Sequence, residues 1–493
     1  MLENYFSKFR NNIIGIDKTF ESPFGAKKII YADWTASGRL YSGIEDTLRN
    51  KIMPLVANTH TETTVTGTAM TQAYHLAKNI IKEHVNANEN DALIFAGSGM
   101  TGVINKLQRI LGIKYPENPL QYLTDNCTVE FDEPKLPVVF ITHMEHHSNQ
   151  TSWLETSVKV EIIGQTEDGL VDVNDLNRLL EKHKNRTLKI ASITACSNVT
   201  GIKTPYHEIA KIMHQHEGFC FVDFACSAPY VSIDMHPKND LEALDVVFLS
   251  PHKFLGGPAT SGVMVLNKEL YKKDVPDNPG GGTVTFTDPW GHHSFIKDIE
   301  AREDGGTPGF LQGIKTALAV RLKEEMGVEN ILKREEEIIE IAFEHFDKMG
   351  EKVHVLANQH RDRLGVFSFY VEDIHYNLLV KILNDRFGVQ TRGGCACAGT
   401  YGHILLNVNQ DFSSKIVCAI QDGNNSEKPG WVRVSIHPTM TNEEITFIME
   451  SIKTVVDNIS EWRTNYTYNS STNEFVFNGN YPQVNVKEWF STN

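Results

Sequence analysis

The stretch Asp245-Val-Val-Phe-Leu-Ser-Pro-His-Lys-Phe-Leu-Gly-Gly257 joins an apolar run, a lysine and a glycine-rich turn. The apolar run predicts a buried strand, and Lys253 follows just after that strand ends. Folds that alternate strands and helices collect ligands at the carboxyl ends of their strands. By itself, however, a lysine at a strand end is more often a solvated cap. The motifs around Lys253 decide between these two interpretations.

Other apolar runs rich in β-branched or aromatic residues predict five more strands. They are Ala92–Ala96, Pro137–Thr142, Leu188–Thr194, Cys220–Phe224 and Gly262–Leu266. Between them, apolar residues return every three or four positions over Gly102–Leu111 and Tyr206–His216, which predicts helices. This alternation predicts a mostly parallel sheet that is covered on both faces.

The 493 residues are enough for two packed domains. We expect an N-terminal segment at 1–30 and a large domain at 31–309. A long helical pattern runs from Phe310 to about Gly350 and predicts a connector into a smaller α/β domain at 310–463. The last segment, 464–493, is rich in Asn, Ser and Thr, and we expect it to pack as an irregular extension.

Composition excludes several classes of function. Lys and Arg number 47 against 62 Asp and Glu, with no basic cluster, so nucleic acid is not an expected partner. No apolar stretch approaches the length of a membrane span, and no signal peptide is evident. The seven widely spaced cysteines favour a reducing, cytoplasmic location. Only Cys395 and Cys397 lie close together, which leaves a zinc site incomplete, so we expect no metal.

A carboxylate and a glycine-rich turn accompany Lys253. Asp223 ends the predicted strand in Cys220-Phe-Val-Asp-Phe-Ala-Cys-Ser-Ala-Pro229 and would be costly to bury without a cationic partner. A protonated pyridine nitrogen is one such partner, although an aspartate here could also cap a helix. In Phe95-Ala-Gly-Ser-Gly-Met-Thr-Gly102 a strand joins a helix, so Met100 and Thr101 could contact a phosphate. The turn lacks the full signatures of nucleotide-binding loops.

Eight motifs in a fixed order resemble those of the cysteine desulfurases in the class V aminotransferase-like superfamily. They are Gly97–Gly102, Met144–Asn149, Cys196–Gly201, Val222–Ala225, Ser250–Lys253, Gly280–Gly282, Gly305–Thr307 and Arg392–Cys397. The resemblance runs from about Tyr31 to Thr441. It implies the fold-type I architecture of pyridoxal-phosphate enzymes, which is an α/β fold. Its large domain has a mostly parallel seven-stranded sheet, and its C-terminal α/β domain is smaller.

The resemblance implies that Lys253 holds pyridoxal 5'-phosphate as a Schiff base. It also implies that Ser250 and His252 help to hold the phosphate. His146 would stack on the pyridine ring and provide a proton donor near the substrate. Asn198 would form a hydrogen bond with the phenolic oxygen of the ring.

Further roles implied by the resemblance concern the substrate and a partner subunit. Thr307 would reach the phosphate of the partner, so we expect a homodimer. Arg433 would clamp the substrate carboxylate, for which a guanidinium fork is suited. His60 would line the substrate entrance. Cys397 would be the nucleophile in the active loop 392–399, although Cys395 lies close to it.

The chain departs from the family pattern at one cofactor position. Cys226 occupies the place where the family usually has a glutamine that supports the ring oxygen. The loop cysteines, taken in isolation, could also be no more than small loop residues.

The implied activity is conversion of L-cysteine to L-alanine, with the sulfur passed to an enzyme persulfide. Two alternatives stay open on the same scaffold. One is a pyridoxal-phosphate C–S lyase, acting on cysteine or selenocysteine, or an amino-acid epimerase, neither of which needs a loop cysteine. The other is a non-catalytic relative that serves as a binding or regulatory protein. A sulfur-acceptor protein is a possible partner for a desulfurase.

Overall fold

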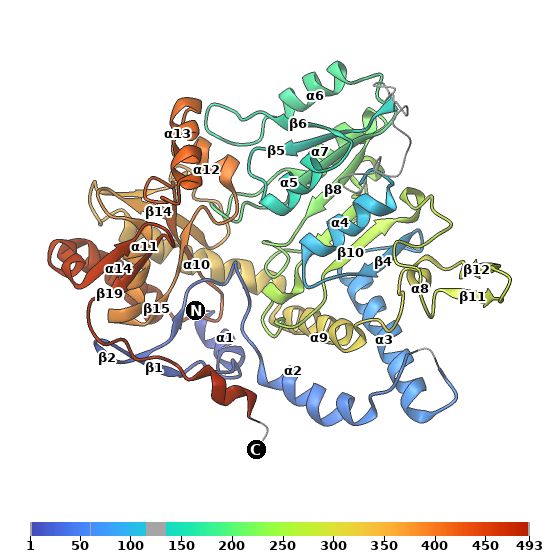
Figure 1. The fold of residues 1–493 in the computed structure, drawn as a ribbon, viewed down its shortest axis with the longest axis horizontal. Coiled ribbons are helices and arrows are strands. Elements are labelled where there is room, and N and C mark those ends of the chain that lie inside the picture. The colour runs from blue at the N-terminus through green and yellow to red at the C-terminus, as the bar shows by residue number, and fades with distance from the viewer. Residues whose placement is uncertain (1, 60, 115–134, 492–493) are drawn as a thin grey trace. The chain divides into compact units, whose positions relative to one another are not determined.

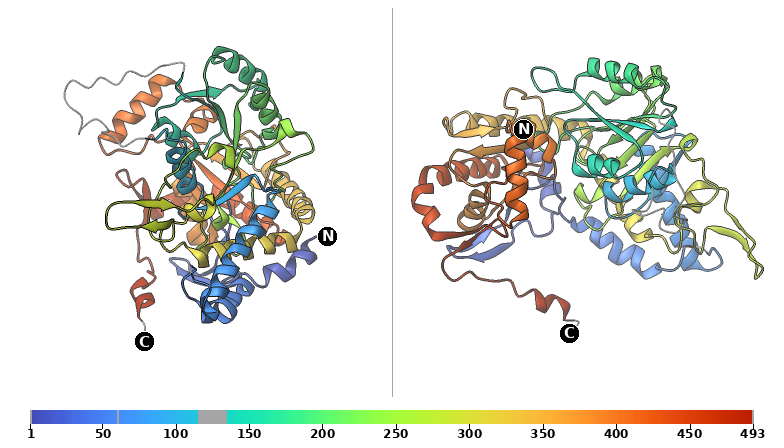
Figure 2. Two further views of the ribbon diagram at one scale, coloured as in Figure 1. Left: turned by 90° about the vertical axis from the view of Figure 1, so that its right-hand side faces the viewer. Right: turned by 45° about the horizontal axis from the view of Figure 1, so that its top comes forward.

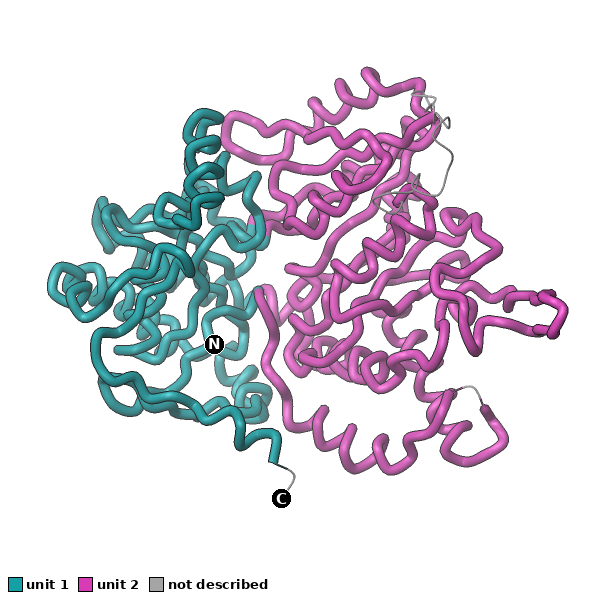
Figure 3. Tube along the Cα trace, viewed as in Figure 1, with its two compact units in different colours: residues 1–35, 198–201, 333–493 teal, residues 36–197, 202–332 magenta. Residues whose placement is uncertain are grey.

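The computed structural model describes residues 2–59, 61–114 and 135–491. The chain forms two compact units (Figure 3). Unit 1 comprises Met1–Thr35, Asn198–Gly201 and Lys333–Asn493, and unit 2 comprises Ala36–Ser197 and Ile202–Leu332. The domain boundaries inferred from the sequence stay predictions.

Unit 2 contains a seven-stranded sheet in the order β4-β10-β9-β8-β7-β5-β6 (Figure 1). Its strands are β4 (Asp91–Phe95), β5 (Val138–Thr142), β6 (Lys159–Ile163), β7 (Lys189–Thr194), β8 (Phe219–Asp223), β9 (Val246–Leu249) and β10 (Val263–Asn267). Strands β6, β5, β7, β8 and β9 pair in parallel, whereas β10 is antiparallel to both of its neighbours. The prediction of a mostly parallel seven-stranded sheet is confirmed.

Each predicted strand lies within one or two residues of an observed one, but β6 was not predicted from an apolar run. Strand β6 lies at the edge of the sheet and includes Lys159 and Glu161, which are not buried. An edge strand needs fewer apolar side chains than a central one, so its sequence gives a weaker signal.

Helices cover both faces of this sheet, since consecutive residues of its central strands are buried. The helices of unit 2 are α2 (Ser42–Thr47), α3 (Val65–His84), α4 (Met100–Ile110), α5 (His147–Leu154), α6 (Val173–Lys182), α7 (Tyr206–Gln215), α8 (Ile299–Arg302) and α9 (Phe310–Met326). Helix α4 buries Val103, Ile104 and Leu107 in one core cluster with Ile94 and Phe248 of the sheet. This packing fixes the start of α4 at the end of β4.

A hairpin of β11 (Val284–Thr287) and β12 (His293–Phe295) extends from the body of unit 2 (Figure 1, Figure 2). Near its tip, Trp290 is 80% exposed. The hairpin leads into the Gly305–Thr307 motif through α8.

Unit 1 is built on a four-stranded antiparallel sheet in the order β13-β14-β17-β16. Its strands are β13 (Val353–Val355), β14 (Val366–Val371), β17 (Trp431–Ser435) and β16 (Arg392–Gly394). The N-terminal part contributes α1 (Glu3–Arg10), the hairpin β1 (Thr19–Ser22) and β2 (Gly25–Lys28), and β3 (Ile30–Tyr31), which pairs in parallel with β15 (Val389–Gln390). The helices that follow are α11 (Tyr376–Ile382), α12 (Gly399–Leu405), α13 (Gln410–Gln421) and α14 (Asn442–Trp462).

Two predictions about the C-terminal half need correction. The long helical pattern from Phe310 forms two helices, α9 and α10 (Val328–Phe346), which Gly327 separates with a φ of +76°. Glycine adopts this left-handed conformation without steric cost. The last segment is not wholly irregular, because β18 (Tyr466–Asn469) and β19 (Glu474–Phe477) pair as an antiparallel hairpin.

Within residues 2–59, 61–114 and 135–491, no helix is both long enough and apolar enough to cross a membrane.

Candidate active site

In unit 2, Asp223 and Lys253 follow two neighbouring parallel strands. Asp223 ends β8, and Lys253 lies in the short turn Pro251–Lys253 after β9. The Asp223 side chain is buried and accepts a hydrogen bond of 2.8 Å from the backbone N–H of Ala225. Burial raises the pKa of Asp223 to about 6, and the positive charge of Lys253 opposes that rise. The structure therefore brings the predicted ring partner and the predicted cofactor lysine into electrostatic contact.

The predicted phosphate residues also come together at the start of α4. The backbone N–H of Met100 donates a hydrogen bond of 2.9 Å to Oγ of Ser250. A Cβ placed on Gly99 would lie 3.1 Å from that hydroxyl and 3.4 Å from the His252 ring. Gly99 is the N-cap and provides no side chain for the first turn. The glycine thus leaves room beside a helix N-terminus, which is a favourable place for an anion.

His252 is expected to be neutral at pH 7. Burial lowers the pKa of His252 to about 4, and the nearby positive charge of Lys253 lowers it further. Thr101, one position after Met100, is exposed, and its Oγ1 lies 2.6 Å from Oγ of Ser148.

His146 is held by the helix that it begins. It is the N-cap of α5, and its Nδ1 accepts a hydrogen bond of 3.1 Å from the backbone N–H of Ser148. Ser148 therefore connects His146 with Thr101, a link that the sequence analysis did not identify. The signal for it was present, because Ser148 lies within the Met144–Asn149 motif.

Glu145 is a second residue that the sequence analysis missed. Its carboxylate is 2% exposed and accepts hydrogen bonds from Oγ1 of Thr142 (2.7 Å), the backbone N–H of Thr194 (2.9 Å) and Nδ2 of Asn149 (2.7 Å). Burial raises the pKa of Glu145 to about 7, and the negative charge of Asp223 adds to the rise. An acidic residue just after a buried strand was the available signal.

Three further positions from the sequence analysis are Thr307, His60 and Cys226. Thr307 is exposed on unit 2, one residue after Gly306 with its φ of +80°. His60 lies outside the described residues. Cys226 is buried, and its Sγ lies 3.9 Å from the backbone oxygen of Ser197.

In unit 1, Arg433 lies in the middle of β17 and is 2% exposed. Its Nη2 donates to Oδ1 of Asp33 at 2.6 Å, and its Nη1 donates to the backbone oxygen of Asn198 at 3.1 Å. Its Nε is buried and has no hydrogen-bond partner within the described part of the chain. Asp33 is the residue that the sequence analysis missed here, since only the fold brings it to Arg433.

The loop that follows β16 carries both candidate cysteines, which are half-buried. Ala396 and Cys397 have φ values of +50° and +58°, a conformation that costs energy in residues other than glycine. Two contacts hold this loop. Nδ2 of Asn198 donates a hydrogen bond of 2.7 Å to the backbone oxygen of Ala396, and Nη2 of Arg392 lies 3.7 Å from Sγ of Cys397.

The predicted site residues are thus divided between the units. Unit 2 holds Met100, Thr101, His146, Asp223, Ser250, His252, Lys253 and Thr307, and unit 1 holds Asn198, Cys397 and Arg433. Within unit 2 the lysine, the carboxylate and the phosphate residues gather at strand ends. Within unit 1 the arginine and the cysteine loop both contact Asn198.

Comparisons with known proteins bear on the family and the fold of the chain. A probable cysteine desulfurase from Staphylococcus aureus is 28% identical over 392 residues, 79% of this chain and 87% of that protein. A probable cysteine desulfurase from Halalkalibacterium halodurans is 28% identical over 374 residues, 75% of this chain and 84% of that protein.

The apo structure of a cysteine desulfurase from Thermococcus onnurineus has the same fold. Its TM-score is 0.71 at 20% identity, over 92% of this chain and 98% of that one. The aminotransferase class-V family model matches residues 133–448, and the family is generally dependent on pyridoxal phosphate. Since this match covers more than half of the chain, the protein belongs to the class-V aminotransferase family.

Proposed function

We propose that this protein is a pyridoxal-phosphate-dependent cysteine desulfurase, which converts L-cysteine to L-alanine and keeps the sulfur as a persulfide on Cys397. The observation that carries the proposal is the half-buried cysteine loop, in which Arg392 lies 3.7 Å from Sγ of Cys397. A thiol beside a guanidinium, on an accessible loop, is a suitable nucleophile. The relatives from Staphylococcus aureus and Halalkalibacterium halodurans are both probable cysteine desulfurases, which supports the same activity.

Pyridoxal phosphate fits the residues at the strand ends of unit 2. A cationic ring nitrogen would relieve the cost of burying Asp223, which the raised pKa of that carboxyl reports. The N-terminus of α4, the Ser250 hydroxyl and the neutral His252 ring would hold the phosphate. When bound, the cofactor supplies an aldehyde for the substrate amine and a ring that accepts electron density from Cα.

Lys253 acts as the base in this proposal. With the cofactor bound, the Lys253 amine would be the base that removes the Cα proton of the substrate. His146, held as the N-cap of α5, would stack on the ring and provide a proton donor near the substrate. Asn198 would contribute a hydrogen bond to the ring oxygen through the second N–H of its amide, since the first is donated to the backbone oxygen of Ala396.

Arg433 orients the substrate through its carboxylate. The guanidinium is already charge-balanced by Asp33, and its Nε has no hydrogen-bond partner within the described part of the chain. This buried Nε–H would therefore favour the binding of one more hydrogen-bond acceptor, such as a carboxylate oxygen of the substrate.

Cys397 carries out the sulfur transfer. Its thiolate forms a bond with the substrate sulfur while the bond between that sulfur and Cβ breaks, and the electron pair of the broken bond stays with Cβ. Protonation at Cβ completes the methyl group of alanine, so one cysteine and one enzyme thiol give one alanine and one persulfide. No external oxidant or reductant is needed.

The proposal also includes a homodimer, in which Thr307 would reach the phosphate of the partner subunit and His60 would line the substrate entrance. The exposure of Thr307 after Gly306 is compatible with such a reach. A sulfur-acceptor protein would then take the persulfide sulfur, and the reducing cytoplasm is the compartment that suits a free nucleophilic thiol.

The test is product analysis by mass spectrometry after the cofactor-loaded protein is incubated with L-cysteine. Native protein, Cys397→Ser and the matched control Cys395→Ser are compared. We expect alanine and a persulfide on the peptide that contains Cys397, both lost in Cys397→Ser and retained in Cys395→Ser. Pyruvate, an inverted amino acid, or turnover indifferent to both cysteines would refute the desulfurase and indicate a lyase or an epimerase.

A further inference from the structure

The hairpin of β18 and β19 lies beyond the residues that the family model matches, which end at 448. It is fastened to unit 1 through a buried carboxylate. Asp385 accepts hydrogen bonds from Tyr466 (3.2 Å) at the start of the hairpin and from Tyr481 (2.8 Å) after its end. A fully buried Asp385 with two tyrosine donors and Lys381 at 3.2 Å is a strong anchor. The hairpin is therefore an ordered part of the unit.

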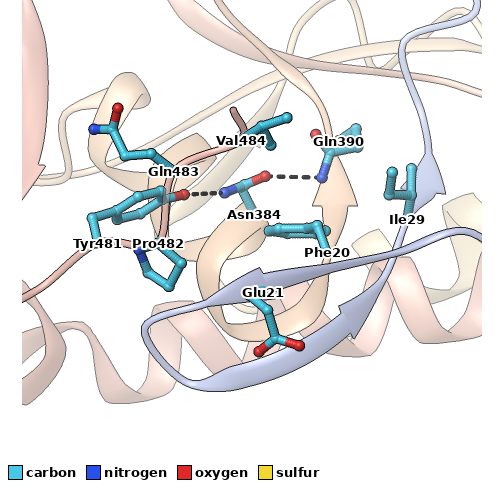
Figure 4. Close-up of a pocket in the computed structure, with 9 residues that line it drawn as sticks. All are labelled: Phe20, Glu21, Ile29, Asn384, Gln390, Tyr481, Pro482, Gln483 and Val484. Atoms are coloured by element: carbon cyan, nitrogen blue, oxygen red, sulfur yellow. Dashed lines mark hydrogen bonds between the residues drawn. The ribbon is translucent and has the colours of Figure 1, made fainter. Parts of the chain in front are cut away.

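The segment after the hairpin reaches the strand that leads to the cysteine loop. Around a cavity of about 340 Å³, Nδ2 of Asn384 donates to Oη of Tyr481 at 3.2 Å (Figure 4). Oδ1 of the same asparagine accepts a hydrogen bond of 2.9 Å from Gln390 (Figure 4). Gln390 is in β15, two residues before Arg392. Through Asn384, the segment after the hairpin is thus linked to β15, just before the loop at 392–399.

The turn of the hairpin makes a second connection through Asn473. Its Nδ2 donates to Oη of Tyr376 at 2.8 Å, and its backbone oxygen accepts a hydrogen bond of 2.5 Å from Nδ2 of Asn377. Oη of Tyr468 donates to Oδ1 of Asn473 at 2.9 Å and fixes the orientation of that amide. Asn473 has a φ of +59°, which asparagine tolerates better than most residues.

Tyr376 and Asn377 in turn lie close to two glycines, Gly393 in β16 and Gly430 just before β17. A Cβ on Gly393 would overlap Oδ1 of Asn377, and a Cβ on Gly430 would lie 2.6 Å from the Tyr376 ring. The same Cβ on Gly430 would lie 3.0 Å from Cα of Gly394, the residue before Cys395. These close approaches leave little room for the strand to shift relative to α11.

The hairpin also holds the segment that leads into β17. The backbone N–H of Asn425 donates to the backbone oxygen of Ser470 at 3.0 Å, and Oη of Tyr376 donates to the backbone oxygen of Lys428 at 3.3 Å. Strand β17 carries Arg433, which is paired in register with Arg392 of β16. The turn between β18 and β19 therefore contacts residues beside β16, which carries Arg392, and residues just before β17, which carries Arg433.

We propose that Asn473 is a positioning residue for the cysteine loop, 392–399, acting through Tyr376 and Asn377. The loop needs such support because Ala396 and Cys397 are held in left-handed conformations that a free chain seldom adopts. The catalytic consequence of this proposal rests on the proposed desulfurase function. The structural part does not, since it concerns the order of the loop.

The test compares Asn473→Gly with the matched control Asn485→Gly in the full-length, cofactor-loaded protein. Glycine keeps the left-handed turn at 473 and removes only the amide, whereas Asn485 bonds Glu488 in the tail and lies outside the hairpin. Hydrogen exchange followed by mass spectrometry reports on peptides that cover 392–399. We expect exchange in the loop to increase about tenfold in Asn473→Gly and to stay at the native rate in Asn485→Gly.

Kinetics provide the second readout. We expect persulfide formation on Cys397 to slow about fivefold or more in Asn473→Gly, while the KM for cysteine stays within about twofold of native. Loop exchange that is equal in the two variants, or that increases only within the hairpin, would overturn the positioning role. Increased loop exchange in a protein whose native form makes no alanine would uphold the positioning role and refute the desulfurase.

Discussion

The strand-end carboxylates of unit 2 and the cysteine loop of unit 1 show two ways of holding a reactive group. Asp223 and Glu145 follow buried strands, are 4% and 2% exposed, and accept hydrogen bonds from backbone N–H groups. The loop at 392–399 begins with the three-residue strand β16, its two cysteines are half-buried, and Ala396 and Cys397 are left-handed. The sheet core thus fixes the two carboxylates, whereas side-chain contacts from Asn198 and Arg392 hold the loop. Substitutions in these two regions should show which steps of the reaction depend on the strand ends of unit 2 and which depend on the loop at 392–399.

The largest expected effect comes from the strand-end lysine. In Lys253→Ala, alanine formation should fall about 10³-fold or more, because the variant lacks the proposed cofactor attachment and base. Alanine production by the loaded protein measures this, with the exposed Lys272→Ala as the matched control. A loss below about tenfold would show that the strand ends of unit 2 do not carry the acid–base chemistry.

Arg433→Lys and Arg392→Lys should separate binding from transfer within unit 1. Arg433→Lys should increase the KM for cysteine about 10- to 100-fold with a smaller change in kcat, because lysine cannot offer the guanidinium fork. Arg392→Lys should instead lower kcat, since its contact is with Cys397. Steady-state kinetics at several cysteine concentrations give both constants. The same KM change in both variants would contradict the division of roles.

Asp223→Asn tests the cost of burying a carboxylate in the cofactor-free protein. Burial raises the pKa of Asp223 to about 6, above its usual 3.8. A raised folded-state pKa gives stability at pH below 3.8 that is lost as the pH rises through about 6. Between pH 4 and pH 7 the native protein should therefore lose about 1–3 kcal/mol more unfolding free energy than the variant. Urea unfolding at both values measures the difference, and parallel pH dependences would refute it.

The smallest expected effect is the relief of backbone strain in the loop. Ala396→Gly should stabilise the protein by up to about 1 kcal/mol, the strain of a left-handed alanine less the added freedom of glycine in the unfolded chain. The same change in a helix, Ala419→Gly in α13, should destabilise by about 1 kcal/mol. Thermal unfolding of both variants gives the signs. Equal destabilisation would mean that the loop is not strained.

The central strands were predictable because parallel strands covered on both faces are nearly continuous apolar runs. Asp223 and Lys253 could be singled out because they lie at the ends of such strands, but the roles predicted for them came from the resemblance and not from position alone. The contacts of Asp33 with Arg433 and of Glu145 with Thr194 could not be predicted, because they join segments far apart in the sequence. The hairpin at 466–477 was missed although Tyr466-Thr-Tyr-Asn469 alternates aromatic and polar residues, because the Asn, Ser and Thr content of the whole segment was interpreted as irregular.

Unit 1 is formed by residues from the first and the last parts of the chain, so it cannot fold completely until the last part has been synthesised. Residues 1–35 include the buried Phe6 and Phe9 and a β3 strand whose partner, β15, is made much later. Arg10 likewise cannot donate its 2.6 Å hydrogen bond to Glu444 until that residue has been synthesised. At about 5–20 residues per second, the roughly 360 residues between β3 and β15 take on the order of 20–70 s to synthesise. During that interval unit 2 can fold on the ribosome, while Phe6 and Phe9 stay without the later part of unit 1 that completes their surroundings.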